Sequence, residues 1–422
     1  MGDNNESYNE DELEAPAWLN SEFFADVLSK HENTSELNVN HVKISPASAK
    51  GDHYASVMFR GAVTYTCRNQ TFTKSLIVKT MPEQEGHKKD MLGESRIFET
   101  EIGMYSEMLP KFEKILRAAG DNTVLHVPCL FYSLKPRKVM VFEDLVPQGY
   151  YVLRDRSMNI EELKCALSKL AKWHAVSFKL LKEDEVQFAS FKDGLMEIPN
   201  FTEDPYIKNG IDLFIRLLDK VPELKQFKPY FEKMRSSHLK ELENVLSEYR
   251  LDRKPNTYYV LSHGDFHLRN MMLKNNETTG AFEDCMLLDF QISNVCPFTV
   301  DVIYSFYMLM DEKQRQNHKD ELLYFYFTTF TSTLQKIGCK GELPHIVEFR
   351  RQLFNHRHYE IFLVTTFLPM IFAMRGNFCD LGEVIQKEDA RWRCYNQPEY
   401  IEDIKRILSE FLHQGYFEDS MQ

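Results

Sequence analysis

The sequence lacks the features of several large classes of protein. None of its apolar runs approaches the roughly 18 to 20 residues that a membrane-spanning helix requires. The eight cysteines are scattered without a C-x-x-C pair, so neither a zinc site nor a disulfide framework is indicated, and we expect reduced thiols. No basic tract offsets the net charge of -12, which argues against a nucleic-acid partner.

The first residues also lack a targeting signal. No basic stretch is followed by an apolar one, and Glu6 stands where a myristoylation motif has Ser or Thr. Residues 1–15 are acidic and have no periodic apolar face, so we expect a disordered arm there. We therefore expect a cytoplasmic protein without a membrane partner, and no protein partner is evident from the sequence.

The most informative segment of the 422 residues is HGDFHLRN, at residues 263–270. Asp265 and Asn270 are separated by five positions, as in the kinase catalytic loop, where a base and a metal ligand face one cavity. Turn residues at 275–280 and the apolar strand 286–288 follow, so we expect a hairpin that returns Asp289 beside Asn270.

These three residues match the needs of phosphoryl transfer from ATP to a hydroxyl. The reaction requires a carboxylate that takes the hydroxyl proton, an Asn that holds one Mg²⁺, and a second carboxylate that bridges metals and phosphates. We predict Asp265 as the base, with Asn270 and Asp289 as catalytic residues and Mg²⁺ ligands. The structural alternative is a tight turn with an Asx cap at Asp265 and a strand terminator at Asp289.

The N-terminal part predicts a small antiparallel sheet with a nucleotide site. An amphipathic helix near Trp18 to Leu28 precedes strands at 39–45, 54–65 and 75–79. Gly51 lies between the first two strands, where a kinase hairpin covers the nucleotide phosphates, although an ordinary hairpin turn would look the same. Lys79 ends its strand like the kinase lysine that pairs with the α- and β-phosphates, although most strand-end lysines are simply solvated.

Two further elements complete the predicted nucleotide site. A helix around residues 97–108 makes Glu101 available to pair with Lys79, with Glu94 and Glu99 as rival partners. The buried strand 139–142 ends at a polar segment where we expect a hinge between two lobes. Backbone groups near 143–145 would be free there to bind adenine, which makes Glu143 and Leu145 candidate nucleotide contacts.

From Pro16 onward the chain resembles the ecdysteroid kinase-like proteins of insects and nematodes, within the wider group of choline kinases and aminoglycoside phosphotransferases. The motifs that carry the resemblance are Gly51–Arg60, Ser75–Lys79, Phe98–Glu101 with Tyr105, Phe142–Leu145, Leu170–Ser177, His263–Asn270, Asp289–Gln291, and Asp301 with Tyr304.

The resemblance implies an α+β, bilobal protein kinase-like fold. Residues 16–142 would form an N-lobe with a small antiparallel sheet and one key helix, and residues 143–422 a large, mostly helical C-lobe. It also implies ATP and Mg²⁺ as cofactors and a small-molecule hydroxyl as the acceptor. The family often has Trp at position 267, whereas His267 here is more similar to aminoglycoside phosphotransferases.

Departures from protein kinases favour a small-molecule substrate. Gln291 replaces the Gly of D-F-G, and Asp301 follows Asp289 by only twelve residues, which leaves no room for an activation loop. The helical segments between His174 and residue 263, and beyond Asp301, could instead enclose a pocket, with the aromatic-rich stretch 362–372 as a lining.

Three polar residues are expected to support the site rather than to react. We predict that His174 is a core histidine that braces the catalytic loop, that the His263 ring packs beside Asp289, and that Asp301 accepts backbone N–H bonds from the loop.

The expected function is phosphorylation of an apolar alcohol such as an ecdysteroid. One alternative is a choline- or aminoglycoside-type kinase, whose cationic substrate an acidic chain could attract. Another is a silent nucleotide-binding module, which would be free to lose one of Lys79, Asp265, Asn270 and Asp289.

Overall fold

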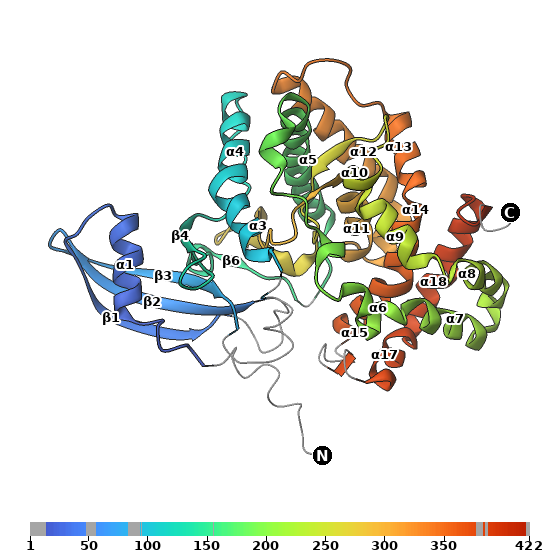
Figure 1. Cartoon of the computed structure of the whole chain (residues 1–422), viewed down its shortest axis with the longest axis horizontal. Helices are drawn as coiled ribbons and strands as arrows, with labels where there is room; N and C mark the ends of the chain where they lie inside the picture. The colour runs from blue at the N-terminus through green and yellow to red at the C-terminus, as the bar shows by residue number, and fades with distance from the viewer. Residues whose placement is uncertain are drawn as a thin grey trace. The chain divides into compact units, whose positions relative to one another are not determined.

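The structure is a computed structural model that describes residues 14–47, 56–82, 93, 95–154, 156–376, 383–384 and 387–418. The chain folds into two compact units. Unit 1 contains the described residues of 1–111, 125–151 and 272–291, and unit 2 those of 112–124, 152–271 and 292–422. Antiparallel sheet dominates the N-terminal region and helices dominate the remainder, which confirms the α+β class (Figure 1).

The units do not follow the predicted division at residues 142 and 143. Residues 272–291 belong to unit 1 although they lie far along the chain, and residues 112–124 belong to unit 2 although they come early. The reason is that compact units form through packing in space, so a helix or hairpin can join the unit that buries it rather than the one that precedes it in sequence.

The main sheet of unit 1 has five antiparallel strands in the order β1-β2-β3-β5-β4. Their bounds are β1 Leu37–Pro46, β2 Val57–Cys67, β3 Gln70–Thr80, β4 Cys129–Ser133 and β5 Val139–Glu143. Arg68 and Asn69 form a two-residue turn between β2 and β3, both with positive φ, as a type I′ hairpin requires. This turn fixes the register that pairs Lys79 with Met58, and on the other side of β3 Lys79 pairs with Met140 of β5.

Helix α1 (Ser21–His31) packs against this sheet (Figure 1), and apolar side chains of the helix and the strands together form a hydrophobic core. Asn20 caps the helix by accepting hydrogen bonds from two backbone N–H groups of the first turn. Phe24 lies directly over Gly61 of β2, where a Cβ atom would stand 2.5 Å from the Phe24 ring. The close approach of helix and strand therefore depends on the absence of a side chain at position 61.

The helix that carries Glu101 contains a π turn. It begins as α3 (Ile97–Gly103), continues as a π turn at Met104–Met108, and resumes as α4 (Leu109–Ala118). A small second sheet, in the order β6-β8-β9, consists of β6 (Tyr150–Tyr151), β8 (Met271–Asn275) and β9 (Phe282–Leu287). The turn between β8 and β9 lies where the sequence predicts it, and Asp289 follows β9 after one residue.

Unit 2 is built on two long helices that pack together, α5 (Ile160–Glu183) and α12 (Glu312–Lys336). Each begins with a capping box, formed by Asn159 with Glu162 and by Asp311 with Gln314. Strand β7 (Tyr259–Leu261) pairs antiparallel with β10 (Val295–Pro297), and α11 (Thr299–Met308) follows directly. The segment HGDFHLRN lies between β7 and β8.

Further helices of unit 2 are α6 Pro205–Lys208, α7 Gly210–Lys220, α8 Lys228–Met234, α9 His238–Leu246, α10 Glu248–Leu251, α13 Ile346–Asn355, α14 Arg357–Phe362, α15 Leu368–Arg375, α17 Glu388–Tyr395 and α18 Pro398–His413. A π turn at Leu363–Phe367 joins α14 to α15. Among the helices that the structure describes, none combines the length and the apolar character needed to cross a bilayer.

Candidate functional site

Lys79 lies in a buried ionic cluster of unit 1. Its Nζ is 2.6 Å from Oε2 of Glu101 and 2.7 Å from Oδ1 of Asp289. Lys79 and Glu101 are almost fully buried, whereas the Asp289 side chain keeps 22% of its exposure. Of the three glutamates considered as partners, Glu101 makes the contact; Glu99 pairs with Lys138, and Glu94 lies outside the described residues.

The cluster holds one cation and two carboxylates, so it carries excess negative charge. Burial raises the pKa of Glu101, the ammonium of Lys79 opposes this, and the charge of Asp289 adds to it. Burial also favours the neutral amine of Lys79, but the two carboxylates outweigh that effect and raise the pKa of Lys79 above its usual value. Lys79 is therefore an ammonium at any physiological pH.

The backbone at Asp289 is in the left-handed region, with φ of 63°. Asp tolerates this region better than most residues, yet the conformation still costs on the order of 1 kcal/mol. The next residue supports it: the Phe290 ring lies 5.2 Å from the ring of Tyr105, which is 4.8 Å from that of Phe142. Tyr105 belongs to the π turn, so the helix of Glu101 also braces the Asp289 segment.

The predicted hinge segment is held mainly by Asp144. Its carboxylate accepts hydrogen bonds from Arg60 Nε at 2.6 Å, Ser75 Oγ at 2.7 Å and the N–H of Val146 at 3.1 Å. The N–H groups of Glu143 and Asp144 donate to Pro128 and Ser75 carbonyls.

The prediction that backbone groups near 143–145 are free to bind adenine is therefore wrong for the N–H groups of Glu143 and Asp144. Both are used to continue the sheet pairing at the end of β5. The N–H of Leu145 donates to no backbone carbonyl in the described chain, which leaves it as the N–H of this segment that a ligand could use. Gly51, the predicted phosphate-loop glycine, lies outside the described residues.

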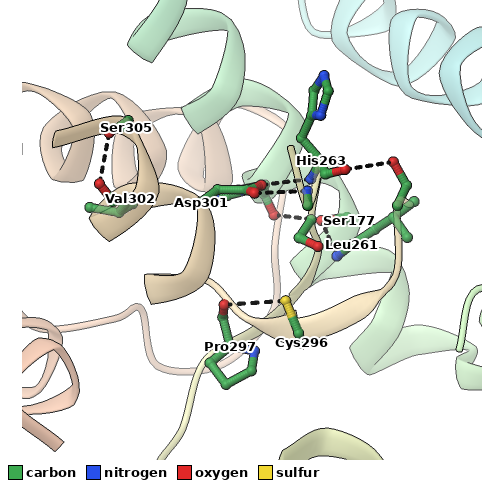
Figure 2. A network of polar contacts seen from close by, with 12 residues as sticks. Ser177, Leu261, His263, Cys296, Pro297, Asp301, Val302 and Ser305 are labelled. Carbon is green, nitrogen blue, oxygen red and sulfur yellow. Dashed lines mark hydrogen bonds and ion pairs between the residues drawn. The ribbon is translucent and has the colours of Figure 1, made fainter. Parts of the chain in front are cut away.

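In unit 2, Asp301 anchors the backbone of HGDFHLRN (Figure 2). Its Oδ2 accepts the N–H of His263 at 2.6 Å and its Oδ1 the N–H of Gly264 at 2.9 Å. His174 Nε2 is 3.0 Å from the Asp301 carboxylate, and its Nδ1 is 2.6 Å from the Tyr326 hydroxyl. These buried contacts confirm the predicted supporting roles of Asp301 and His174.

The carboxylate of Asp265 is surrounded by hydrogen-bonding groups. The Tyr304 hydroxyl donates to Oδ1 at 2.7 Å, and Asn270 Nδ2 donates to Oδ2 at 2.9 Å. His267 Nε2 lies 3.2 Å from Oδ2. The N–H of Arg269 donates to His267 Nδ1, which places the proton of the neutral ring on Nε2, toward Asp265.

This environment decides the charge of Asp265. Burial favours the protonated acid, but the electrostatic interaction and hydrogen bond of His267, the hydrogen bond of Tyr304 and the electrostatic interaction of His263 together outweigh burial. The pKa of Asp265 is therefore held well below its ordinary value, and the carboxylate is ionised at neutral pH.

The model of the ecdysteroid kinase-like family matches residues 50–339, more than half of the chain. The chain belongs to the ecdysteroid kinase-like family. The match spans Lys79, Glu101, Asp265, Asn270 and Asp289. It identifies the protein as a member of a kinase-like phosphotransferase family, in agreement with the resemblance seen in the sequence motifs.

Two solved structures to which the chain is similar are phosphotransferases. Spectinomycin phosphotransferase APH(9)-Ia, solved with AMP, has 12% identity and a TM-score of 0.39, with 90% of this chain and 99% of that chain covered. Macrolide 2'-phosphotransferase MphH from Brachybacterium faecium has 11% identity and a TM-score of 0.40, with 90% and 98% covered. No curated protein matches the chain in sequence.

Tyr304 of this ecdysteroid kinase-like protein contacts Asp265, a role that the sequence motifs do not assign to it. Tyr304 follows Asp301 by three positions, so both side chains lie on one face of a helix. Since Asp301 holds the loop, this spacing is the signal in the sequence that Tyr304 reaches the same loop.

Within unit 2, the His263 ring packs against other aromatic side chains. The ring is buried, with its centroid 5.7 Å from those of Trp173 and Phe266. Its Nδ1 accepts the N–H of Asp265 at 3.4 Å. His263 thus supports the backbone of Asp265, and its contact with Asp289 stays a prediction.

The predicted Mg²⁺ ligands have suitable donor atoms. Neither Oδ1 of Asn270 nor Oδ2 of Asp289 accepts a hydrogen bond from the residues that the structure describes. Those residues contain no cluster of three or more His, Cys, Asp or Glu side chains able to hold a metal. Mg²⁺ is commonly bound through one or two carboxylates together with substrate phosphates and water, so each of these oxygens is of the kind that binds this ion.

Proposed function

We propose that this ecdysteroid kinase-like protein transfers the γ-phosphoryl group of ATP to a hydroxyl of an apolar metabolite such as an ecdysteroid. The observation that carries the proposal is the burial of Lys79 between Glu101 and Asp289. A strand-end lysine without a ligand function is normally solvated. A buried ammonium held by two carboxylates is what phosphate binding requires, since it is oriented and charged before the nucleotide arrives.

Each residue then has a role in the proposed reaction. Lys79, oriented by Glu101, contacts the phosphates of ATP. The N–H of Leu145 contacts the adenine, together with the backbone of Glu143 other than its N–H, which donates to Pro128. Asn270 and Asp289 hold Mg²⁺, which supplies charge neutralisation at the phosphate oxygens when it is bound.

Asp265 accepts the proton of the substrate hydroxyl. Its low pKa makes it a weak base, so it holds and orients the hydroxyl first and takes the proton as the new O–P bond forms. This order suits phosphoryl transfer, whose transition state is loose and requires little activation of the nucleophile.

The surroundings of Asp265 support an apolar acceptor. The ring of Phe367 lies 6.3 Å from the ring of Tyr304, whose hydroxyl contacts Asp265, and Phe367 is only partly buried. In contrast, Phe362, Leu363 and Val364 are fully buried, so the first part of the predicted pocket lining belongs to the core. The exposed edge of Phe367 offers an apolar surface to a substrate, with Asp265 as the polar anchor.

The test is a substrate panel. Purified protein is incubated with MgATP and ecdysone, other apolar alcohols, choline, ethanolamine or kanamycin, and mass spectrometry detects an added phosphate. We expect modification of ecdysone or another apolar alcohol, with Asp265→Asn as the matched control that forms product about 10²-fold more slowly. Selective modification of choline or kanamycin would replace this substrate class by a polar cationic one. Binding of MgATP without any phosphorylated product would indicate a silent nucleotide-binding module.

We also propose the cytoplasm as the place of action, because the reaction needs ATP. The proposal involves a small-molecule partner alone, without nucleic acid, membrane or another protein.

A further inference from the structure

Helix α11 contacts the catalytic segment at two levels. In its first turn, Asp301 binds the backbone N–H groups of His263 and Gly264 (Figure 2). One turn later, the Tyr304 hydroxyl reaches the side chain of Asp265. One rigid element therefore fixes both the backbone of the loop and the carboxylate that the loop presents.

The contacts of Asp265 leave little freedom to its carboxylate. An ionised carboxylate has about four lone-pair positions for hydrogen bonds. Asn270 and His267 lie against Oδ2, and Tyr304 donates to Oδ1. One position on Oδ1 then remains for a substrate hydroxyl.

We infer that Tyr304 is a positioning residue for Asp265, which it holds so that Oδ1 accepts the hydrogen bond of the substrate hydroxyl. This inference rests on the proposed function. Without the phenol, Asn270 and His267 would still hold Oδ2, but rotation of the carboxylate would no longer be restrained on its Oδ1 side. The substrate hydroxyl would meet a carboxylate with several orientations, and fewer encounters would have the geometry of reaction.

Tyr304 is suited to this role because it is a permanent donor. Burial and the nearby Asp265 raise the pKa of Tyr304 well above its usual value, so its O–H stays protonated at working pH. The residue is 6% exposed, and its ring packs beside Phe367 and His267, which limits motion of the hydroxyl. The competing interpretation is that the buried hydroxyl of Tyr304 donates to Asp265 only to satisfy its own hydrogen bond, without an effect on turnover.

A double-mutant cycle separates these interpretations. The four proteins are wild type, Tyr304→Phe, Asp265→Asn and the double variant, assayed with MgATP and the apolar alcohol that the panel identifies, beginning with ecdysone. We expect Tyr304→Phe to lower kcat about 10-fold with the KM for ATP unchanged, and Asp265→Asn to lower it about 10²-fold. The double variant should be no slower than Asp265→Asn, because Tyr304 acts only through the carboxylate.

Tyr307→Phe is the matched control. Tyr307 lies on the same helix, is also buried, and donates to the carboxylate of Glu360 at 2.6 Å. Glu360 keeps hydrogen bonds from Lys319 and Tyr416 in this variant, so its kcat should match that of wild type. A general effect of losing a buried phenol on α11 would appear in both tyrosine variants.

The outcomes are distinct. Losses of kcat that multiply in the double variant, or a Tyr304→Phe enzyme as fast as wild type, would overturn the role of Tyr304 and leave the proposed function standing. A wild-type protein that phosphorylates nothing overturns the proposed function, and this role with it. Should Tyr304→Phe melt too low for assay at 25 °C, the four proteins are assayed at a temperature where all are folded, and losses of kcat that multiply there overturn the role in the same way.

Discussion

Lys79 balances two carboxylates with a single ammonium, and this arrangement predicts the consequences of its removal. Lys79→Met should reduce turnover on the order of 10²-fold, because a preorganised phosphate contact is lost. It should also destabilise the nucleotide-free protein by about 3–5 kcal/mol, since Glu101 would remain buried without its partner. Enzyme assays and thermal melting measure the two effects.

Lys74→Met provides the control for that variant. Lys74 lies on the same strand and pairs with Glu32 at 2.9 Å, but both side chains are about 30% exposed. Such a pair contributes about 0–1 kcal/mol, so melting temperature and turnover should change little. Equal effects of the two substitutions would show that the Lys79 cluster is an ordinary surface contact.

The destabilisation of Lys79→Met should depend on pH with a definite sign. Loss of the ammonium raises the pKa of Glu101 further above its unfolded value of about 4.3. A raised carboxyl pKa means that the folded state binds more protons than the unfolded state, so stability is retained below pH 4.3 and lost as pH rises. The melting temperature of the variant should therefore fall relative to wild type between pH 5 and pH 8.

At the scale of elements, the loop before Asp265 depends on one glycine. Gly264 has φ of 82°, and a Cβ atom there would stand 2.6 Å from the carbonyl oxygen of Ile292, a backbone atom that cannot move alone. Gly264→Ala should cost about 2–4 kcal/mol through strain and displacement. A shift of about 1 Å in the loop should also lower turnover by as much as 10²-fold.

Gly280→Ala isolates the conformational part of this effect. Gly280 also has positive φ, of 69°, but a Cβ atom there meets no atom within 4 Å. The substitution Gly280→Ala should therefore cost only about 1–2 kcal/mol of stability and leave turnover unchanged. If the two alanine variants melted at the same temperature, the contact with Ile292 would have no energetic importance.

Several elements could be predicted because their signals are local. The turn residues at 275–280 specify the hairpin that precedes Asp289, and the alternation of β2 specifies its buried face. The pairing of Lys79 with Glu101 could also be predicted from local patterns, because Lys79 ends an apolar strand and Glu101 lies in a segment with helical periodicity. Asp301 as a loop anchor, in contrast, was predicted with the motifs of the family resemblance, because its contact with the loop joins residues 38 positions apart.

At the scale of the whole molecule, the remaining features depend on packing between distant segments. The sequence of residues 112–124 does not indicate that they join the helical unit. The sequence near Glu143 likewise does not indicate that its N–H donates to the carbonyl of Pro128. Similarly, the periodicity of 362–372 does not separate the buried Phe362 from the partly exposed Phe367. These outcomes are decided by which surfaces meet, and a single sequence carries little information on that.

The whole chain should be stabilised by nucleotide, and this response separates binding from chemistry. A non-hydrolysable ATP analogue with Mg²⁺, at about 100 times its Kd, should stabilise the wild-type protein by about 2.7 kcal/mol through mass action. Asp289→Asn should lose most of this shift, because Asp289 contacts Lys79 and is the proposed metal ligand in unit 1. Asp265→Asn should keep it, since Asp265 is proposed to act on the hydroxyl rather than on the nucleotide.

Kinetic measurements on the same two variants complete the comparison. Asp265→Asn should retain the thermal shift and yet turn over roughly 10²-fold more slowly, the usual size of the loss of a proton acceptor. The shift should require Mg²⁺ in wild type and be nearly insensitive to it in Asp289→Asn. The reverse pattern, with a full Mg²⁺-dependent shift in Asp289→Asn and none in Asp265→Asn, would exchange the two roles and refute the assignment of base and metal ligand.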